Sequence, residues 1–360
     1  MGSDRMTVTH DRPNASASAR PSASGSSARP RRRRPLIVLG LTGVVLLCIV
    51  LSIAIGAKPI PIGDVWAGLV SPENSENDVI IRSLRVPRTV LGLLVGAALG
   101  IAGALMQGHT RNPLADPGLL GVEAGAAFAV VLAIYSFGVT DTLGFVWFAF
   151  AGALVASLVV FALGSLGQGA ATPVTLALAG AAVSALLGSF TSALILMDRQ
   201  TLDVFRFWQV GALTGRPTRV IWEVLPFLIV GLLLALYNAP ALNLLSLGED
   251  VARSLGQSVF TTRAIGIASI TLLTGAAVAA AGPIGFVGLV VPHVARIFTG
   301  PDYRWLLPCS ALLGGSLVLL TDTIGRVVVR PGEMQVGIIM ALVGAPFFIW
   351  LVRRRRLAAL

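Results

Sequence analysis

The chain has 360 residues, of which 55% are hydrophobic and only 12% are charged. Because soluble globular chains carry about 25% charged residues, this composition argues against a water-soluble protein. The formal charge of +10 lies at the ends: residues 1–34 hold eight arginines and two aspartates, 353–356 are four arginines, and 35–352 hold 15 basic and 15 acidic residues. A nucleic-acid-binding protein needs a basic face on its folded body, so that class is excluded.

Ten apolar segments are predicted to cross a membrane as helices, each of which needs about 20 apolar residues. They lie at 36–56, 89–108, 118–137, 143–166, 173–196, 218–238, 261–281, 284–298, 304–325 and 335–352. The eighth barely reaches across a bilayer, because a helix rises about 1.5 Å per residue. The predicted fold class is therefore an all-α polytopic membrane protein, with one transmembrane domain over 35–352.

The two basic ends predict how the chain is oriented. Residues 1–34 are mostly Ser, Ala, Arg and Pro, and this composition predicts a disordered tail. The first apolar segment is too long for a cleaved signal peptide and lacks a cleavage site, so we expect a retained signal anchor. Arginine runs beside the first and last segments predict a multi-pass protein of the cell membrane with both tails, 1–34 and 353–360, in the cytoplasm.

Two segments share a pattern of small residues. Gly96 and Gly103 in the second segment are echoed by Gly275 and Gly282 in the seventh, each with Ala-Ala after the first glycine. Small residues at this spacing let helices pack closely in lipid. Because the two segments run in opposite directions five segments apart, we expect an inverted 5+5 repeat, with chance similarity as the alternative.

The loop 239–260 is predicted to contain a short amphipathic helix at 247–255. Ser246 and Glu249 have the spacing of a capping box, and Gly256 is a typical helix stop. Leu247, Val251 and Leu255 would share one face of this helix. Such a helix either rests on the lipid surface or docks a cytoplasmic partner.

Arginines gather at the opposite side of the predicted membrane domain. Arg82, Arg85 and Arg88 precede the second segment, and Arg326 and Arg330 follow the ninth. Arginines on the outer side run against the usual charge bias of membrane proteins. They are therefore either membrane anchors or contacts for a charged partner, since a guanidinium matches a carboxylate well.

Few other polar residues are available for chemistry. Glu123 in the third segment is a candidate for the transport pathway, because a carboxylate in the membrane is costly unless it faces a cavity or a partner. His109 and His293 have no neighbouring ligand at metal spacing, and Cys48 and Cys309 lie inside apolar segments, so neither a metal site nor a disulfide is predicted. The chain also lacks the Gly-rich phosphate-binding loop followed by Lys and Ser or Thr.

Several motifs together resemble the FecCD permease family, which are membrane subunits of type II ABC importers for iron-siderophores, haem and cobalamin. The motifs are Arg85-Val86-Pro87-Arg88, the run 111–121, Leu247-Gly248-Glu249, the run 282–293 and Gly344-Ala345-Pro346-Phe347-Phe348. The resemblance covers about 35–352. One departure follows the ninth segment, where the family usually has Ala-Glu-Leu-Pro and this chain keeps the acid as Glu333 but lacks the proline.

The resemblance implies a set of partners and sites. It implies a second permease subunit, two cytoplasmic ABC ATPase subunits that hold ATP and Mg, and an extracytoplasmic substrate-binding lipoprotein. The loop helix would be the ATPase-coupling helix, and Arg85, Arg88 and Arg326 would dock the binding protein. The coupling residues carried over are Leu247, Gly248, Glu249, Val251, Ala252, Arg253, Leu255 and Gly256.

The function implied is that of an importer permease with no catalytic residues or cofactor of its own. It would move a ferric-siderophore-type complex inward by alternating access, with cobalamin or haem as alternative substrates and a homodimer or heterodimer both open. A secondary transporter would couple through ionisable residues near the bilayer centre, where Glu123 stands nearly alone. A polytopic membrane enzyme would need a cluster of His, Asp or Cys at one membrane face.

Overall fold

The computed structural model describes residues 34–71, 73, 75–166 and 172–353, and every regular element in these ranges is a helix, which confirms the all-α fold class. Arg34, which the sequence places in the tail, is the first residue of a helix. Arg353, the first residue of the predicted tail 353–360, is the last residue of a helix, and the remaining residues of both tails lie outside the described residues. The elements are α1 (Arg34–Ala54), α2 (Ile62–Val70), α3 (Glu76–Val79), η1 (Ile80–Arg85), α4 (Val86–Thr110), η2 (Pro117–Leu120), α5 (Val122–Phe137), α6 (Thr142–Ser165), α7 (Pro173–Met197), α8 (Arg199–Gln209), α9 (Thr218–Leu245), α10 (Glu249–Ser254), α11 (Val259–Ala281), α12 (Val287–Thr299), α13 (Tyr303–Val328) and α14 (Val336–Arg353).

Each of the ten predicted segments has a helix at its position. Among the described residues, seven helical stretches are long and apolar enough to cross a membrane, and they contain α1, α4, α6, α7, α9, α11 and α13. Three shorter apolar helices, α5, α12 and α14, occupy the third, eighth and tenth predicted segments. The exact number of crossings stays a prediction. The amphipathic helix α8, which begins at the cap Asp198, was not predicted.

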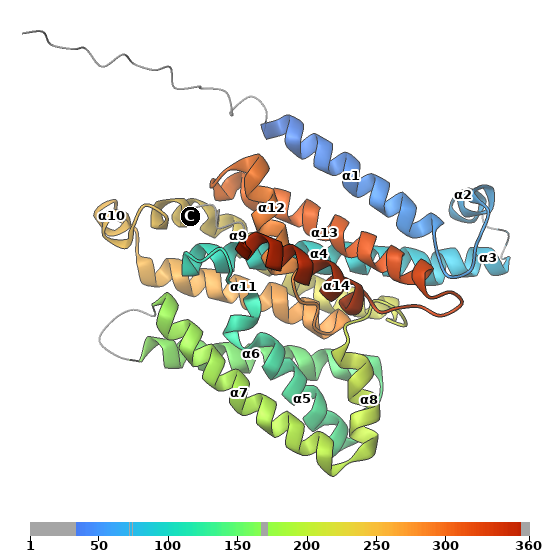
Figure 1. Ribbon diagram of the computed structural model, residues 1–360, viewed down its shortest axis with the longest axis horizontal. Coiled ribbons are helices and arrows are strands. Elements are labelled where there is room, and N and C mark those ends of the chain that lie inside the picture. Colours follow the sequence, from blue (N-terminus) through green and yellow to red (C-terminus); the bar gives the residue numbers. More distant parts are fainter. Residues whose placement is uncertain (1–33, 72, 74, 167–171, 354–360) are drawn as a thin grey trace, which may run out of the picture.

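The centre of the bundle is formed by α4 and α11, which are the most buried of the long helices. Both are rich in Ala and Gly and are apolar on all sides, as expected for helices enclosed by other helices. Helices α1 and α7 lie on the outside of the bundle and leave most of their apolar surface exposed (Figure 1). That surface is suited to lipid or to another membrane helix.

The two halves of the chain interlock around this centre. Helix α4 of the first half packs against α12 and α13 of the second half, and α11 of the second half packs against α5 and α6 of the first. In each half of the chain, the helices of the third and fourth predicted segments therefore pack against the helix of the second predicted segment of the other half. This exchange is the arrangement that an inverted repeat would produce, although the repeat itself stays a prediction.

The echoed glycines have unequal surroundings. A Cβ added at Gly96 would lie 2.3 Å from the carbonyl oxygen of Gly314, and one at Gly103 would lie 2.0 Å from that of Gly288. Gly282 ends α11 with a φ of 76° and would meet the Trp208 carbonyl oxygen at 2.4 Å. At Gly275 the nearest atom would be 3.4 Å away, which is ordinary contact. Only three of the four positions thus require the absence of a side chain.

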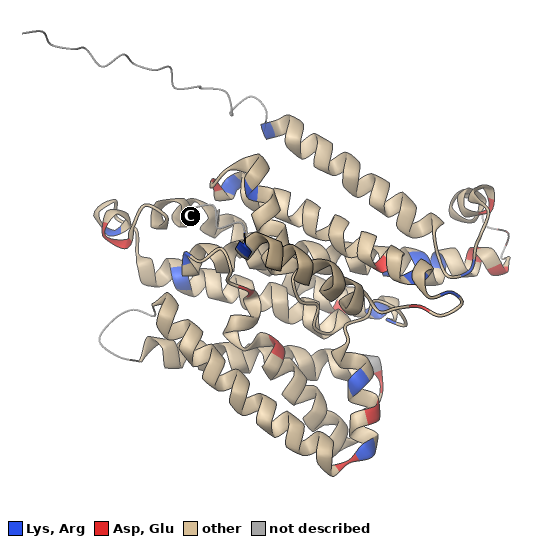
Figure 2. Ribbon diagram, viewed as in Figure 1, with Lys and Arg blue, Asp and Glu red and all other residues tan. Residues whose placement is uncertain are grey.

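The bundle has two distinct ends, which we call the α10 end and the α2 end. In Figure 1 the first and last described residues lie toward the α10 end, while α2 and α3 lie at the opposite end. Charged residues gather mostly at these two ends, and the middle of the bundle carries few of them (Figure 2). Functional contacts with polar partners are therefore expected at the ends.

Candidate functional site

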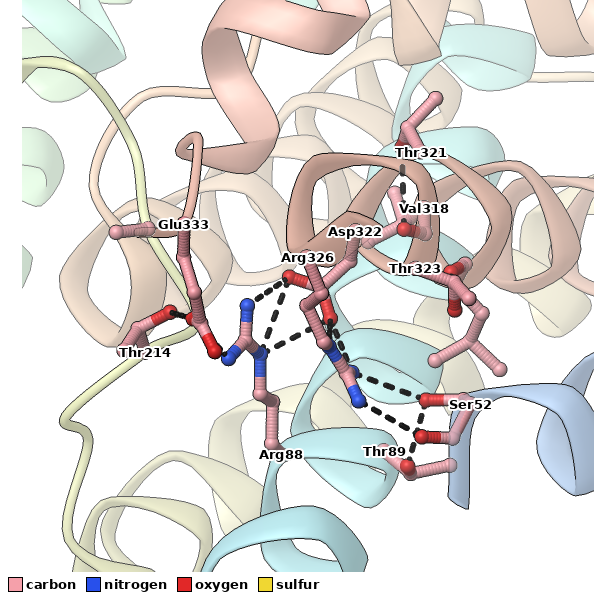
Figure 3. Close-up of polar contacts among 12 residues, drawn as sticks. Ser52, Arg88, Thr89, Thr214, Val318, Thr321, Asp322, Thr323, Arg326 and Glu333 are labelled. Atoms are coloured by element: carbon pink, nitrogen blue, oxygen red, sulfur yellow. Dashed lines mark hydrogen bonds and ion pairs between the residues drawn. The ribbon is translucent and has the colours of Figure 1, made fainter. Parts of the chain in front are cut away.

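A buried ionic network joins α4, α13 and the segment after α13 at the α2 end (Figure 3). The Arg88 guanidinium donates to both carboxylate oxygens of Asp322, with Nη2–Oδ1 at 2.8 Å and Nε–Oδ2 at 3.0 Å. Its Nη1 donates to Glu333 Oε2 at 2.6 Å, and the same oxygen accepts from the Thr214 hydroxyl at 3.0 Å. Arg326 also binds Asp322, through Nε at 3.0 Å and through Nη2.

The same region closes the carboxyl-terminal end of α1. The last carbonyls of a helix have no partner within the helix and carry its negative partial charge, so cations are favoured there. Arg85 Nη1 donates to the carbonyl oxygens of Ile53 and Ala54, both at 2.8 Å. Arg326 Nη1 donates to the Ser52 carbonyl oxygen at 2.7 Å, and Arg330 Nη2 donates to that of Gly56 at 2.9 Å.

These contacts leave the three predicted docking arginines largely buried. Arg85 is 5% exposed and Arg326 is 1% exposed, while the Arg88 side chain is 10% exposed. Their guanidinium groups are directed into the protein because Asp322 and the end of α1 supply acceptors that the sequence pattern does not reveal. Whether they also contribute to docking a binding protein stays a prediction.

A cavity of about 560 Å³ opens beside this network at the α2 end. Its charged lining consists of the basic residues Lys58, Arg85, Arg88, Arg216 and Arg326 and the acidic residue Glu333. Arg216 also lines a neighbouring cavity of about 550 Å³ and donates through Nε to the Ala212 carbonyl oxygen at 3.2 Å. Burial lowers the pKa of Arg216 to about 10, so it remains charged at neutral pH. Within the described residues no ion pair involving Arg216 is found.

At the other end, the loop helix is shorter than predicted and begins differently. Helix α10 covers Glu249–Ser254, with Gly248 as its N-terminal cap at a φ of 117°. The predicted capping box is wrong: Ser246 ends α9, and its hydroxyl donates to the Asn243 carbonyl oxygen instead. Since α9 continues to Leu245, Ser246 is engaged before α10 begins.

Helix α10 and its flanks nevertheless present an apolar row on the surface. Leu247, Val251 and Leu255 are 63%, 44% and 60% exposed, whereas Ala252 is fully buried against the bundle. An exposed apolar row on a small projecting helix is typical of a surface that binds a partner. Glu249 of α10 is turned toward the bundle, since it forms ion pairs with Arg253 and with the buried Arg263 of α11.

The remaining candidates lie inside the bundle. Glu123 is in the first turn of α5 and lines a cavity of about 350 Å³ together with Thr191, Ser192 and Gln209. His109 is buried and its Nε2 lies 3.1 Å from Asn238 Nδ2. In the part of the chain that the structure describes, no group of three or more His, Cys, Asp or Glu side chains could hold a metal ion.

Sequence reasoning missed three residues that organise these sites. Asp322 is the shared partner of two arginines, Arg216 lines both cavities at the α2 end, and Arg263 anchors Glu249. The available signal was the charge balance: residues 35–352 have equal numbers of acids and bases, so buried pairing could have been expected for the few acids there.

The chain is similar to a known protein family, to characterised proteins and to a solved structure. The FecCD transport family matches residues 44–354. The ferric enterobactin transport system permease protein FepD of Escherichia coli (strain K12) is 48% identical over 323 residues, covering 89% of this chain and 96% of FepD. The iron(3+)-hydroxamate import system permease protein FhuB of Bacillus subtilis (strain 168) is 40% identical over 327 residues, covering 89% of this chain and 84% of FhuB.

A relative named for a different substrate also matches this chain. The cobalamin import system permease protein BtuC of Halobacterium salinarum is 43% identical over 289 residues, covering 80% of this chain and 77% of BtuC. Among solved structures, a metal-chelate type ABC transporter in an inward-facing conformation matches with a TM-score of 0.77 and 30% identity. That match covers 89% of this chain and 99% of the other.

Proposed function

Because the chain belongs to the FecCD transport family, we propose that it is the permease subunit of an ABC importer that carries a ferric-siderophore-type iron complex into the cytoplasm. Partner ATPase subunits would hold ATP and Mg, and this chain would supply the path and the mechanical link. Transport would proceed by alternating access, in which rigid helices rearrange around a central route. Cobalamin and haem are the competing substrates.

The observation that carries this proposal is the exposed apolar row Leu247, Val251 and Leu255. Exposed leucines that flank a short helix between two long ones are costly in water, and this cost is removed when a partner covers them. An ATPase subunit that holds this helix would move α10 whenever it closes on ATP. The chemistry of hydrolysis then stays on the partner, and the permease needs only to transmit the motion.

The substrate assignment is supported by the similarity to FepD and FhuB, whose names concern ferric enterobactin and iron(3+)-hydroxamate. A homodimer or a heterodimer with a second permease subunit would enclose the central path. The apolar surface of α7, which is mostly exposed in the single chain, is available to lipid or to that second subunit. Both described ends of the chain lie toward α10, which fits two cytoplasmic termini on the ATPase side (Figure 1).

The α2 end would then face an extracytoplasmic binding lipoprotein. The guanidinium groups of Arg85 and Arg326 already bind α1 and Asp322. They therefore form part of this surface and would not extend to the binding protein. Arg216, which lines two cavities and has no ion pair within the described residues, is the cation best placed to meet a carboxylate of the binding protein. The ion pair would form at the rim of the cavity, where complementarity governs docking.

The experiment that tests the function is uptake into proteoliposomes that contain this chain, its ATPase and its binding protein. Radiolabelled ferric siderophores, haem and cobalamin would be compared with ATP or with a non-hydrolysable analogue inside. ATP-dependent uptake of a ferric siderophore supports the proposal. Preferential uptake of cobalamin or haem would reassign the substrate, and uptake driven by an ion gradient without the ATPase would identify a secondary transporter.

A further inference from the structure

Helix α10 is separated from its neighbours by two turns that only glycine adopts readily. Gly248 precedes it with a φ of 117°, and Gly256 follows it with a φ of 83°. Positive φ values let the chain change direction sharply at both points. The helix therefore stands apart as a small unit at the α10 end (Figure 1). Besides the short connections to α9 and α11, its movement reaches the bundle through the contacts that it makes there.

One of these contacts is an ion pair with the core. Glu249 Oε1 accepts from Arg263 Nη2 at 2.5 Å, while Glu249 Oε2 lies 3.3 Å from Arg253 Nη2 within α10 itself. The Arg263 side chain is 4% exposed and belongs to the second turn of α11, one of the two most buried long helices. Because removing one partner of a buried ion pair leaves an uncompensated charge, such a pair resists separation.

From Arg263 the polar contacts continue into two further helices. The neighbouring Thr262 accepts on its hydroxyl from Gln257 Nε2 at 2.8 Å, and its carbonyl oxygen accepts from Asn238 Nδ2 of α9 at 3.1 Å. Asn238 Nδ2 also lies 3.1 Å from His109 Nε2 of α4. The His109 ring rests on α11, since a Cβ at Gly266 would fall 1.7 Å from that nitrogen. The first turns of α11 are thus held to α9 and to α4.

We infer that the Glu249–Arg263 ion pair is the link that carries movement of α10 into α11, and that Glu249 is a positioning residue for coupling and not a contact to the ATPase. This inference rests on the proposed coupling of α10 to ATPase subunits. Association with the ATPase and transmission of movement are thus divided between two faces of one short segment. The exposed row Leu247, Val251 and Leu255 would provide association, and Glu249, turned toward α11, provides transmission.

The test replaces Glu249 by Gln, which keeps the size of the side chain and removes its charge. The complex with the ATPase should still co-purify, because the apolar row is intact. ATP-dependent uptake, and the stimulation of ATP hydrolysis by the loaded binding protein, should fall about tenfold or more, as expected for loss of a coupling free energy. The matched control is Glu76→Gln at the α2 end, where Glu76 pairs with Lys58 at 2.7 Å and is 81% exposed. It should leave uptake unchanged.

A charge swap tests whether the two side chains act as a pair. Glu249→Arg combined with Arg263→Glu should recover at least part of the stimulation that each single change removes, because the ion pair is restored with reversed polarity. Wild-type uptake by Glu249→Gln, or loss of ATPase co-purification in that variant, would overturn the inference. If the unchanged chain fails to bind the ATPase, the proposed function fails instead.

A further measurement leaves the ion pair intact and so does not depend on folding of the Glu249 variants. Spin labels at Ser254→Cys on α10 and Thr261→Cys on α11 would report the distance across the link, since Cys48 and Cys309 are buried. The inference predicts the same distance with and without ATP, because the two segments move together. A distance that changes with nucleotide would show that the link opens during transport and would overturn it.

Discussion

Arg88 of α4 and Asp322 of α13 form a two-pronged ion pair between helices that are 234 residues apart in sequence. The Asp322 side chain is 1% exposed, and it also serves Arg326, which in turn holds the end of α1. One carboxylate therefore connects three helices at the α2 end (Figure 3). Because both arginines are almost fully buried, Asp322 compensates the charge of both, and Glu333 supplies a second carboxylate to Arg88.

Replacement of Asp322 by Asn should strongly destabilise the protein. The change leaves two buried guanidinium groups without their shared anion, and breaking a buried pair in this way costs about 3–5 kcal/mol. The midpoint of thermal unfolding in detergent should fall accordingly. Asp203→Asn is the matched control, because Asp203 and its partner Arg206 are 61% and 58% exposed and such pairs contribute about 0–1 kcal/mol. Equal midpoints for the two variants would contradict the structural role of Asp322.

Charge reversal at Arg216 should weaken docking of the binding protein without unfolding the permease. Arg216→Glu places an acid where a carboxylate is expected to dock, so we predict about tenfold lower affinity and a weaker dependence on salt. Arg219→Glu is the comparison, because Arg219 is 74% exposed and already pairs with Glu223. Affinity can be measured by surface plasmon resonance on permease in nanodiscs. If Arg85→Glu retained full stability and abolished docking while Arg216→Glu had no effect, the docking assignment would be wrong.

The echoed glycines should respond unequally to a methyl group. Gly96→Ala would push a Cβ to 2.3 Å from the Gly314 carbonyl oxygen and force α4 away from α13, which we expect to lower stability by about 1–3 kcal/mol. Gly275→Ala meets its nearest atom at 3.4 Å and should be neutral or should stabilise by up to about 1 kcal/mol, since Ala favours helix. Thermal unfolding of both variants checks this. The reverse order would contradict the packing of α4 on α13.

How much of this architecture can be predicted from sequence depends on the kind of signal. Apolar length places every long helix, since an apolar run of about 20 residues has few other stable states. Helix α9 continues to Leu245, beyond the predicted segment 218–238, and Asn238 lies buried within it, 3.1 Å from His109 Nε2. Helix α8 was missed because it has polar residues around short apolar stretches.

The site residues also differ in whether the sequence alone predicts their position. The residues predicted to form an apolar row, Leu247, Val251 and Leu255, are all exposed, although Leu247 and Leu255 flank α10 and do not lie within it. The direction in which the Arg85 side chain points cannot be predicted from the sequence, because its acceptors are carbonyl oxygens of α1, about 30 residues earlier in the chain. Backbone acceptors carry no sequence signature. Contacts between distant segments therefore decide whether an arginine is buried or free, and only the fold reveals them.

Glu123 should affect transport and not assembly. Its carboxylate lines a cavity of about 350 Å³ with Thr191, Ser192 and Gln209, and Glu123→Gln keeps the shape of the lining but removes its charge. If the cavity belongs to the transport path, ATP-dependent uptake should change while association with the ATPase and the binding protein does not. Uptake assays and co-purification on the same preparation check this. Unchanged uptake would remove Glu123 from the pathway.

The most direct test of ATP coupling through α10 is made on the double variant Leu247→Asp and Leu255→Asp. Covering each leucine is worth about 1.5–3 kcal/mol, so losing both should weaken ATPase association at least about a hundredfold. The matched control is Leu166→Asp, since Leu166 is 73% exposed and follows α6 at the same end. We predict that the double variant loses both ATPase co-purification and ATP-dependent uptake in proteoliposomes, and that the control keeps both. Undiminished co-purification and uptake by the double variant would contradict the account.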